Sequence, residues 1–467
     1  MFTLISFQLA ALLSFIGIRQ FCAGQLFNIN SVLNELFPED IYQGQRSRSP
    51  ICVHDIPSPI HFEEESERMN CYQEVSQRGR SPHPDQNKRT NEVLAAYDYD
   101  MVTYDNVITK DGYTLTLFRI RGNKKSPPKI GKPVVLLFHG LGTASDQWVL
   151  QYGDRNLAFK LADAGYEVWL ANARGTDYSR QHTKLNAERD IEYWNFSFHE
   201  IALYDFPAIL DVISSETGEE NIYFIGHSMG GAVYAIALAE MPELNQRVRA
   251  GFLLAPAIFL GHSYSPYRIL QPILELPLQM QAMINRALRG RLEGSNPTAF
   301  LSPAQLCTPT AMRCDLCGNA IFFLYGYDGR QLNFTNVPNI LSKIFNTHSF
   351  KTLLHFGQNF RSCLFRKYDY GRRANLKMYG QVQPPSYSLH KIVAPTYIYY
   401  GDSDNFVPPI DVATTRDALP PETVQGYSRV NWTLFNHVDF MVAKDADVLV
   451  YNGILEILED YKFGRRK

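Results

Sequence analysis

The chain has 467 residues, of which 45% are hydrophobic and 20% are charged. This composition is typical of a folded globular protein and excludes a wholly disordered chain. The 45 Lys and Arg residues nearly balance the 47 Asp and Glu residues, so the net charge of −2 excludes a global attraction to nucleic acid or to an anionic membrane. Any partner has to be recognised by a local surface.

The first 24 residues predict a cleaved signal peptide. Apolar side chains run from Phe2 to Ile18, and the small residues Ala23 and Gly24 follow at a position suited to cleavage. The run is shorter than the roughly 20 residues that a membrane-spanning helix needs. We therefore expect a secreted or lysosomal protein without a transmembrane segment.

Six cysteines remain once Cys22 is removed with the signal peptide, and this even number suits pairing in an oxidising compartment. They are Cys52, Cys71, Cys307, Cys314, Cys317 and Cys363. Cys314 and Cys317 form a C-x-x-C motif, but neither a second such pair nor a histidine at ligand spacing accompanies it. The sequence therefore predicts local disulfides and no metal site.

Three sequons, at Asn195, Asn333 and Asn431, predict N-glycosylation of a secreted protein. A sequon with a buried backbone would stay unmodified. Because Asn195 and Asn431 lie in aromatic-rich surroundings, Asn333 is the strongest candidate of the three.

Residues 25–92 predict a polar extension before the folded part of the chain. From residue 45 onward this segment is charged, rich in proline and serine, and without periodicity, which is typical of disorder. Lys88 and Arg89 lie near its end and suggest a pro-segment that is removed at a basic site. A solvated linker that is never cut is the alternative.

After residue 97, short β-branched and aromatic runs alternate with helical stretches. The runs are 114–120, 134–138, 167–171, 221–225, 251–255, 396–400 and 430–435. Strands that alternate with helices predict right-handed crossovers and a mostly parallel sheet buried on both faces. The expected fold class is therefore α/β, with residues 93–257 and 394–467 forming the core.

The alternation lapses between residues 258 and 393, where apolar residues recur at helical spacing. Examples are Leu276, Met280, Met283, Ala287 and Leu288. We expect an inserted helical cap or lid there. The helix around residues 276–288 suits either a lid that meets a lipid surface or an ordinary buried cap helix.

The chain closes with apolar residues on one helical face, which predict a final helix packed on the sheet. These residues are Val448, Tyr451, Leu455 and Leu458.

The sequence Gly226-His227-Ser228-Met229-Gly230 follows one predicted strand and precedes a helix-forming stretch. In this context G-x-S-x-G indicates a nucleophile elbow, a sharp turn that exposes the serine hydroxyl and leaves space only for small flanking residues. Ser228 is therefore the predicted nucleophile. The similar sequence around Ser263 lacks the closing glycine and a preceding strand, so Ser263 is rejected.

A serine hydroxyl needs a neighbouring base, and in chains with this elbow the order is Ser, acid, His. Only His390 and His437 lie well beyond the expected cap, and His390 precedes the strand that should deliver the acid. His437 is therefore the predicted base. Asp402 or Asp404, in the turn after residue 400, could orient it, and spacing leaves this choice open.

Acyl transfer also needs two backbone N–H groups that stabilise the oxyanion. Met229, the residue after the nucleophile, is expected to supply one of them. The loop His139-Gly140-Leu141-Gly142, after the strand 134–138, is expected to supply the other through Leu141. His139 is expected to stabilise this loop.

Taken together, these residues resemble the acid lipases of the gastric and lysosomal type, and in particular an insect-like secreted member of that family. The resemblance covers the chain from about residue 97 to its end. The motifs that carry it are DGYTLTLFRI (111–120), FHGL (138–141), GYEVWLANARG (165–175), WNFSFHEIALYDFPA (194–208), GHSMGG (226–231), GDSDNFVPPIDV (401–412) and FNHVDF (435–440).

The resemblance implies an α/β-hydrolase fold with a helical cap or lid at about 258–393. It implies Ser228 as nucleophile, His437 as base and Asp404 as acid, with Leu141 and Met229 at the oxyanion positions. It also implies a lipase without cofactor that cleaves fatty-acyl esters of neutral lipids, such as triacylglycerol or sterol esters, at a lipid–water interface. A carboxylesterase for smaller soluble esters is the alternative; a non-catalytic lipid-binding relative would be marked by loss of the serine or the histidine.

Overall fold

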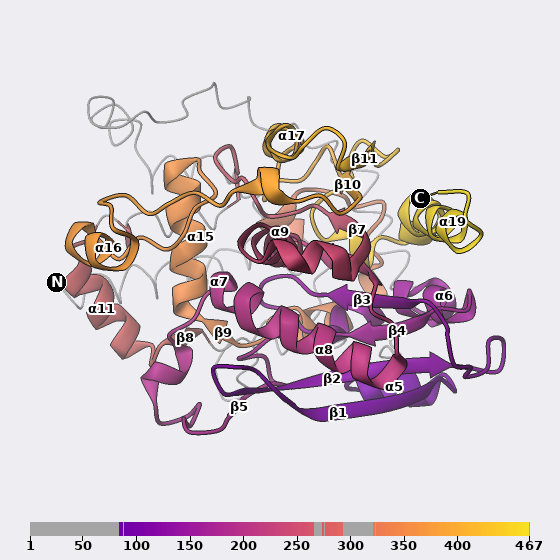
Figure 1. The fold of residues 1–467 in the computed structure, drawn as a ribbon. Helices are drawn as coiled ribbons and strands as arrows, with labels where there is room; N and C mark the ends of the chain where they lie inside the picture. Colours follow the sequence, from indigo (N-terminus) through magenta and orange to yellow (C-terminus); the bar gives the residue numbers. More distant parts are fainter. Residues whose placement is uncertain are drawn as a thin grey trace, which may run out of the picture. The chain divides into compact units, whose positions relative to one another are not determined.

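The computed structural model describes residues 84–86, 88–265, 273–274, 276–292, 321–322 and 324–466. Their main feature is a central sheet with the strand order β1-β2-β4-β3-β6-β7-β10-β11, to which β5 adds by pairing with the start of β2 (Figure 1). The strands are β1 Asp100–Ile108, β2 Tyr113–Gly122, β3 Val134–Phe138, β4 Glu167–Leu170, β5 Gln181–His182, β6 Ile222–His227, β7 Val248–Leu254, β10 Thr396–Tyr400 and β11 Val424–Arg429. All neighbours from β4 to β11 pair in parallel, and only the β1–β2, β2–β4 and β2–β5 pairs are antiparallel. The expected mostly parallel sheet is confirmed.

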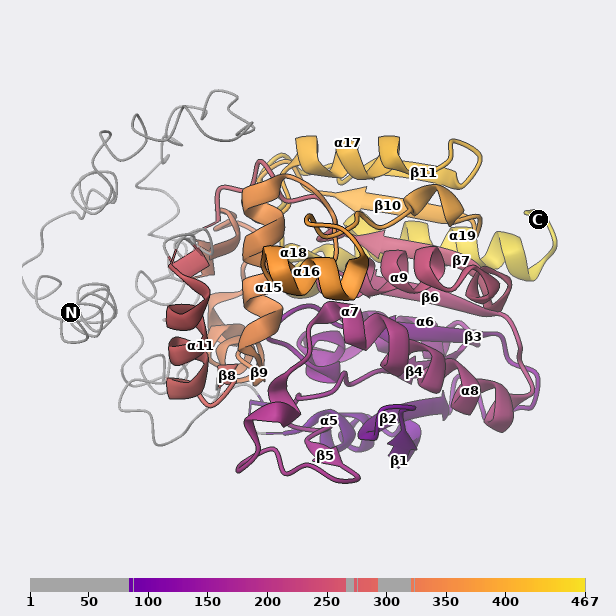
Figure 2. The same ribbon diagram turned by 60° about the vertical axis from the view of Figure 1, so that its left-hand side comes forward.

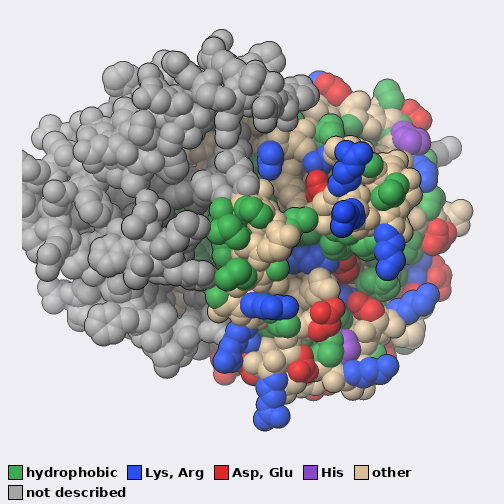
Figure 3. Space-filling view, turned by 90° about the vertical axis from the view of Figure 1, so that its left-hand side faces the viewer, with side chains coloured by type: hydrophobic (Ala, Val, Ile, Leu, Met, Phe, Trp, Pro, Cys, Tyr) green, Lys and Arg blue, Asp and Glu red, His purple; other side chains and the backbone are tan. Residues whose placement is uncertain are grey.

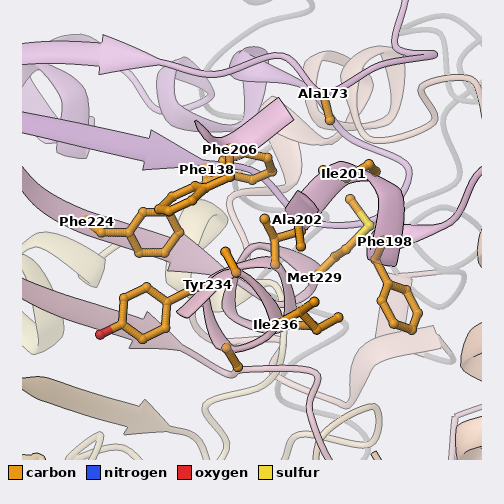
Figure 4. Close-up of a cluster of buried hydrophobic side chains, with 14 of the residues drawn as sticks. Phe138, Ala173, Phe198, Ile201, Ala202, Phe206, Phe224, Met229, Tyr234 and Ile236 are labelled. Carbon is orange, nitrogen blue, oxygen red and sulfur yellow. The ribbon is translucent and has the colours of Figure 1, made fainter. Parts of the chain in front are cut away.

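The core lies on both faces of this sheet. All five residues of β3 are buried, and their side chains alternate between two apolar clusters: Val134, Leu136 and Phe138 face one, and Val135 and Leu137 face the other. Helices α8 (Phe206–Thr217) and α9 (Met229–Glu240) complete the first cluster, part of which Figure 4 shows. Helices α6 (Leu157–Asp163) and α19 (Asn452–Lys462) complete the second. Burial on both faces explains why the central strands read as continuous apolar runs.

The chain between β7 and β10 contributes a group of helices and a short antiparallel strand pair. They are α11 Leu278–Ala287, β8 Arg291–Leu292, α14 Val337–Lys343, β9 His348–Ser349, α15 Phe350–Ser362 and α16 Arg372–Tyr379. Leu353 and Leu354 of α15 pack near Leu141, just beyond β3, so α15 lies at the carboxyl ends of the parallel strands (Figure 2). The remaining helices are α5 Thr90–Ala96, α7 Phe198–Glu200, α17 Pro409–Ala418 and α18 Asp439–Val442.

Shorter helical turns join these elements. They are η2 Ser145–Val149, η3 Gly153–Arg155, η4 Ile191–Trp194, η5 Ile201–Asp205, η6 Pro242–Arg247, η8 Phe334–Asn336, η9 Leu389–Lys391 and η10 Asp447–Tyr451. None of the helices in the described part of the chain is long and apolar enough to cross a bilayer.

The predicted strand 430–435 is wrong, and the two outer strands of the sheet were missed. The last strand is β11, which ends at Arg429; the following residues turn, with Trp432 N donating to the Val430 carbonyl and Phe435 N to that of Trp432. Val430 and Phe435 are apolar because they insert into the core. By contrast, β1 and β11 lie at the sheet edges and are largely solvent-facing, so neither shows an apolar run.

The end of the predicted extension is also wrong, because residues 84–86 and 88–92 belong to the fold. Asp85 is buried, and its carbonyl oxygen accepts a hydrogen bond from Lys343 Nζ at 2.9 Å. Thr90, the first residue of α5, is buried against Ser145 and Asp146. The predicted signal peptide, the rest of the extension and every cysteine except Cys363 lie outside the described residues; Cys363 is disulfide-bonded.

The final helix is present and packs on the sheet through Tyr451, Leu455 and Leu458, as predicted, and of the four predicted residues only Val448 lies off this face. Val448 is 67% exposed, whereas Tyr451, Ile454 and Leu458 are buried against the sheet. The difference arises because η10 is a π-helical turn, whose wider winding rotates the residues that precede α19 away from the face that packs.

Candidate active site

Ser228 lies at the sharp turn between β6 and α9. Its backbone, with φ 55° and ψ −114°, occupies a region that is strained for any residue other than glycine. Gly230 is needed for this turn because a Cβ atom there would lie 2.5 Å from the carbonyl oxygen of Phe138, at the end of β3. The turn therefore has the geometry of a nucleophile elbow.

Ser228, His437 and Asp404 lie in one hydrogen-bonded line. Ser228 Oγ is 2.9 Å from His437 Nε2, and His437 Nδ1 is 2.8 Å from Asp404 Oδ2. The other carboxylate oxygen of Asp404 accepts hydrogen bonds from the backbone N–H groups of Phe406 and Val407. The Asp404 carboxylate accepts a hydrogen bond from the N–H group at Nδ1 of His437. The lone pair on Nε2 therefore faces the serine hydroxyl, as a general base requires.

Asp404, and not Asp402, contacts the histidine. The Asp402 carboxylate instead pairs with Arg429, at 3.2 Å, where both side chains are partly exposed. The loop that bears the two aspartates packs backbone to backbone on the histidine loop: a Cβ atom on Gly401 would lie 2.1 Å from the carbonyl oxygen of Phe435. This close approach brings Asp404 within reach of His437.

His227, next to the serine, holds the histidine loop. Its Nε2 donates a hydrogen bond to the carbonyl oxygen of His437, at 2.9 Å. Burial, and then the neighbouring His437, lower the pKa of His227 well below its usual value, so its ring stays neutral. His227 can therefore fix the loop without placing a second positive charge beside the imidazole of His437.

Asn436 and Asp439 clamp the same loop from its two sides. Asp439 Oδ2 accepts from the backbone N–H of Asn436 at 2.7 Å, and Asn436 Oδ1 accepts from those of Val438 and Asp439 at 3.0 and 3.2 Å. Asp439 also hydrogen-bonds to the carboxyl group of Asp328, and both side chains are buried. Burial, followed by the charge of Asp328, raises the pKa of Asp439 well above its usual value.

The loop after β3 is held by His139 and Gln147. Because His139 Nε2 accepts from the N–H of Ala173, at 3.0 Å, its proton resides on Nδ1, which donates to the carbonyl of Gly140. Burial lowers the pKa of His139 to about 4. Gln147 Oε1 accepts from Gly140 N and from Thr143 Oγ1, at 3.1 and 2.7 Å. The expected loop-stabilising position of His139 is what the structure shows.

This loop lies beside the serine. A Cβ atom on Gly140 would be 3.2 Å from Ser228 Cβ. Asn346 supports the loop from the other side, donating its backbone N–H to the carbonyl of Gly142. Leu141 packs against the α15 cluster, and Met229 is buried at the start of α9.

Aromatic rings surround the imidazole of His437. The ring of Phe406 lies 4.9 Å from it, and that of Tyr325 stacks on it at 5.8 Å. Phe360 of α15 packs edge-on against Phe406 at 5.7 Å. These rings keep water away from the histidine and give the site apolar surroundings suited to an apolar ligand.

The predicted glycosylation sites differ in exposure, in the opposite order to the one expected. Asn195 and Asn431 are exposed, whereas Asn333 is half-buried, and its side-chain oxygen accepts hydrogen bonds from Thr335. Trp194 and Phe196 beside Asn195 are buried and Trp432 beside Asn431 is half-buried, while the asparagine side chains stay at the surface.

The residues that the sequence analysis rejected as nucleophile, base or metal ligands are not part of the triad or lie outside the described residues. Ser263 is buried and donates to the carbonyl of Asn405, and His390 is exposed. Cys314 and Cys317 lie outside the described residues. Within the described ranges, no group of three or more His, Cys, Asp or Glu side chains could hold a metal ion.

Three of the motifs that carry the family resemblance meet in one buried ion cluster. Arg174 Nε lies 2.6 Å from Asp205 Oδ1, and its two terminal nitrogens lie 2.6 and 2.8 Å from the carboxylate oxygens of Asp111. Arg174 and Asp205 are fully buried. This cluster joins the turn before β2, the segment after β4 and the end of η5, which leads into α8.

Sequence reasoning missed four residues that hold the site: His227, Gln147, Asn346 and Asp439. His227 stands inside the elbow motif, and its place beside the serine was the one signal available. Gln147 and Asp439 lie close in sequence to the loops that they hold, whereas Asn346 contacts the loop after β3 from a distant segment; no local pattern marks any of the three.

A mostly parallel sheet with a strand–serine–helix elbow defines the α/β-hydrolase class. A family model described as alpha/beta hydrolase fold matches residues 133–432, and one described as partial alpha/beta-hydrolase lipase region matches residues 90–152.

The similar proteins of known name are lipases. The chain is 36% identical to Lipase 3 of Drosophila melanogaster, over 76% of this chain and 89% of that protein. It is 33% identical to human lysosomal acid lipase/cholesteryl ester hydrolase, over 81% and 92%, and 31% identical to rat gastric triacylglycerol lipase, over 81% and 93%. The chain belongs to the acid lipase family of α/β hydrolases.

Proposed function

We propose that this protein is a lipase that hydrolyses fatty-acyl esters of neutral lipids, such as triacylglycerols or sterol esters, through a serine acyl-enzyme. The hydrogen-bonded line from Ser228 through His437 to Asp404 carries the proposal. The names of its relatives, which include a cholesteryl ester hydrolase and a triacylglycerol lipase, support the substrate class.

In the proposed mechanism, Ser228 Oγ attacks the ester carbonyl while its proton passes to His437 Nε2, and Asp404 stabilises the imidazolium. The backbone N–H groups of Leu141 and Met229 stabilise the oxyanion. The imidazolium then protonates the departing alcohol. A water molecule, deprotonated by His437, attacks the acyl-enzyme, and the fatty acid leaves as Ser228 recovers its proton.

Residues 258–393 act in this proposal as a helical cap on a hydrolase core made of residues 93–257 and 394–467. The packing of α15 supports the assignment. Helix α15 contacts Leu141, in the loop beside Ser228, and Phe406, in the loop that bears Asp404. A cap at this position would set which acyl chains reach Ser228.

A signal peptide over residues 1–24 would direct the protein to the secretory pathway, and so to a secreted or lysosomal location. The names of the lysosomal and gastric relatives support such a location. Glycosylation at Asn195, Asn333 or Asn431 belongs to the same proposal. N-terminal sequencing of the mature protein tests the signal-peptide cleavage: we expect a start at Gln25, and a start at Met1 contradicts it.

Ser228→Ala tests the proposed chemistry. We expect the variant to keep its unfolding midpoint and to lose hydrolysis of triolein, cholesteryl oleate and short p-nitrophenyl esters, at acid and at neutral pH. Ser215→Ala, at an exposed serine of α8, is the matched control and should retain activity. Undiminished hydrolysis by Ser228→Ala would contradict the proposal. The activity is also measured as the ester concentration passes its solubility limit. If the activity does not increase beyond that limit, a carboxylesterase is favoured instead.

A further inference from the structure

Helices α11 and α16 present apolar side chains to solvent. Leu278 and Met283 on α11 are 51% and 49% exposed, and Leu376 and Met378 on α16 are 56% and 57% exposed. The two helices meet, because Leu278 Cδ1 lies so close to Gly371, the N-cap of α16, that a Cβ atom on this glycine would be 2.5 Å from it. The two helices therefore adjoin, and they lie side by side in the ribbon (Figure 1).

These apolar side chains do not hold α16 in place. The only residue that α16 buries is Asn375, whose Nδ2 donates to Asp369 Oδ1 at 2.7 Å and whose Oδ1 accepts from Tyr370 N at 2.9 Å. Polar contacts thus anchor the helix. Since surface helices are ordinarily held by burying their apolar stripe, Leu376 and Met378 are left available for another contact.

Gln281 is the one buried residue of α11, whose inner face packs on α15 through the partly buried Ile284 and Leu288. The inner contacts of α11 are therefore made without Leu278 and Met283. Like α16, α11 keeps large apolar groups on its outer side.

Exposed cations accompany these apolar groups. Arg286 on α11 and Arg372, Arg373 and Lys377 on α16 are all exposed, and none of them forms an ion pair within the described part of the chain. Neither residues 276–292 nor residues 370–400 contain an Asp or Glu. These two segments are therefore positively charged in a chain of net charge −2, and Figure 3 shows hydrophobic and Lys or Arg side chains together with some Asp and Glu side chains on this side of the molecule.

We propose that this basic–apolar surface, formed by the outer sides of α11 and α16, docks on a lipid surface that carries anionic headgroups. The cations match the headgroups, and the leucine and methionine side chains enter the boundary between headgroups and acyl chains. A soluble polyanion would leave the four apolar side chains in water, and an uncharged lipid surface would leave the cations unmatched. The inference deepens the proposed lipase function and rests on it, because such an enzyme has to remain at the surface of an insoluble substrate.

Co-sedimentation with vesicles tests the proposal, with the protein in the inactive Ser228→Ala form so that hydrolysis cannot alter the lipid. We expect binding to phosphatidylcholine vesicles that contain phosphatidylglycerol, weak binding to pure phosphatidylcholine, and loss of binding in high salt. Each cation near an anionic surface contributes about fivefold to the affinity. The combined change Arg372→Gln, Arg373→Gln and Lys377→Gln should therefore lower the affinity about 100-fold.

A control with the same loss of charge is Lys110→Gln, Lys129→Gln and Lys184→Gln, at exposed positions elsewhere on the protein. It should bind like the parent. Leu376→Ser with Met378→Ser should weaken binding about tenfold in low salt as well, since it removes the apolar contact. Unfolding midpoints of all variants are compared to exclude misfolding.

Equal binding to both kinds of vesicle, or equal loss in the α16 triple variant and its control, would overturn the proposal. The proposal would also be overturned if the triple variant lost binding to heparin, a soluble polyanion, but kept its binding to the vesicles. The lipase function is tested separately on a soluble p-nitrophenyl ester, which the triple variant in the active background should hydrolyse at the parent rate. If the parent itself fails on that ester, the proposed function fails while the vesicle result stands.

Discussion

The ring of His227 donates from Nε2 to the backbone carbonyl of His437, at 2.9 Å, across 210 positions of the chain. The residue before the proposed nucleophile thus fixes the backbone of the proposed base. Both residues are buried, so an unmatched carbonyl at this position would have no water to replace the lost donor.

We expect His227→Phe to lower kcat about 10- to 100-fold with KM nearly unchanged, because a displaced His437 misaligns proton transfer without altering the ester pocket. The unmatched carbonyl should also cost about 1–3 kcal/mol of unfolding free energy. His227→Gln, whose amide nitrogen can reach the same carbonyl, should recover much of both losses. His390→Gln, at an exposed histidine, is the control, and an unchanged kcat in His227→Phe would disprove the positioning role.

The two aspartates after β10 offer a sharper comparison. Asp404→Asn should lower kcat by roughly 10³- to 10⁴-fold, because an amide no longer selects the imidazole tautomer that leaves Nε2 free for Ser228. Asp402→Asn removes the same charge two residues away, where the carboxylate meets only Arg429. It should change kcat very little, and a comparable loss in both variants would mean that Asp404 is not the orienting acid.

The sequence predicts those parts of the fold and of the site whose residues follow a local pattern. The central strands were found because burial on both faces demands apolar runs, and Ser228 and His437 were found because the elbow restricts its residues and fixes the order of its partners. The edge strands β1 and β11 face solvent and carry no such pattern.

The choice between Asp402 and Asp404 could not be made from spacing, since both follow the same turn and only the packing of Gly401 on Phe435 selects one of them. Asn346 supports the loop after β3 through a contact between distant segments, and Asp439 meets Asp328 in the same way. Such contacts leave no periodicity in the chain, so only the folded structure reveals them.

The buried pair of Arg174 and Asp205 should be far more important for stability than an exposed pair. Arg174→Met would leave the buried Asp205 carboxylate without its charge partner, at a cost of about 3–5 kcal/mol in unfolding free energy. Arg247→Met, which breaks the pair between the half-buried Arg247 and the exposed Asp211, removes the same charge and should cost at most about 1 kcal/mol. Denaturant unfolding of the two variants measures the difference, and similar midpoints would contradict the assigned role of the cluster.

The carboxyl pair of Asp328 and Asp439 makes stability depend on pH. Burial raises the pKa of Asp328 to about 6 and that of Asp439 well above its usual value. In the unfolded chain both groups lose their protons near pH 4, so above that pH the folded state binds more protons than the unfolded state. Stability contributed by the pair is therefore present in acid and is lost as the pH rises through about 6. Because Asp439 clamps the backbone beside His437, this loss falls on the loop that bears His437.

Asp328→Asn removes one of these titrations and leaves a neutral amide that can donate to Asp439. Relative to the parent, we expect the variant to gain up to about 3 kcal/mol of unfolding free energy on going from pH 4 to pH 7, since the Asp328 pKa is raised by about two units at 1.36 kcal/mol each. Asp105→Asn, at an exposed carboxylate, should follow the parent at every pH. Chemical unfolding across this range measures the difference. Parallel curves for the parent and Asp328→Asn would show that the two carboxyl groups do not share a proton in the folded protein.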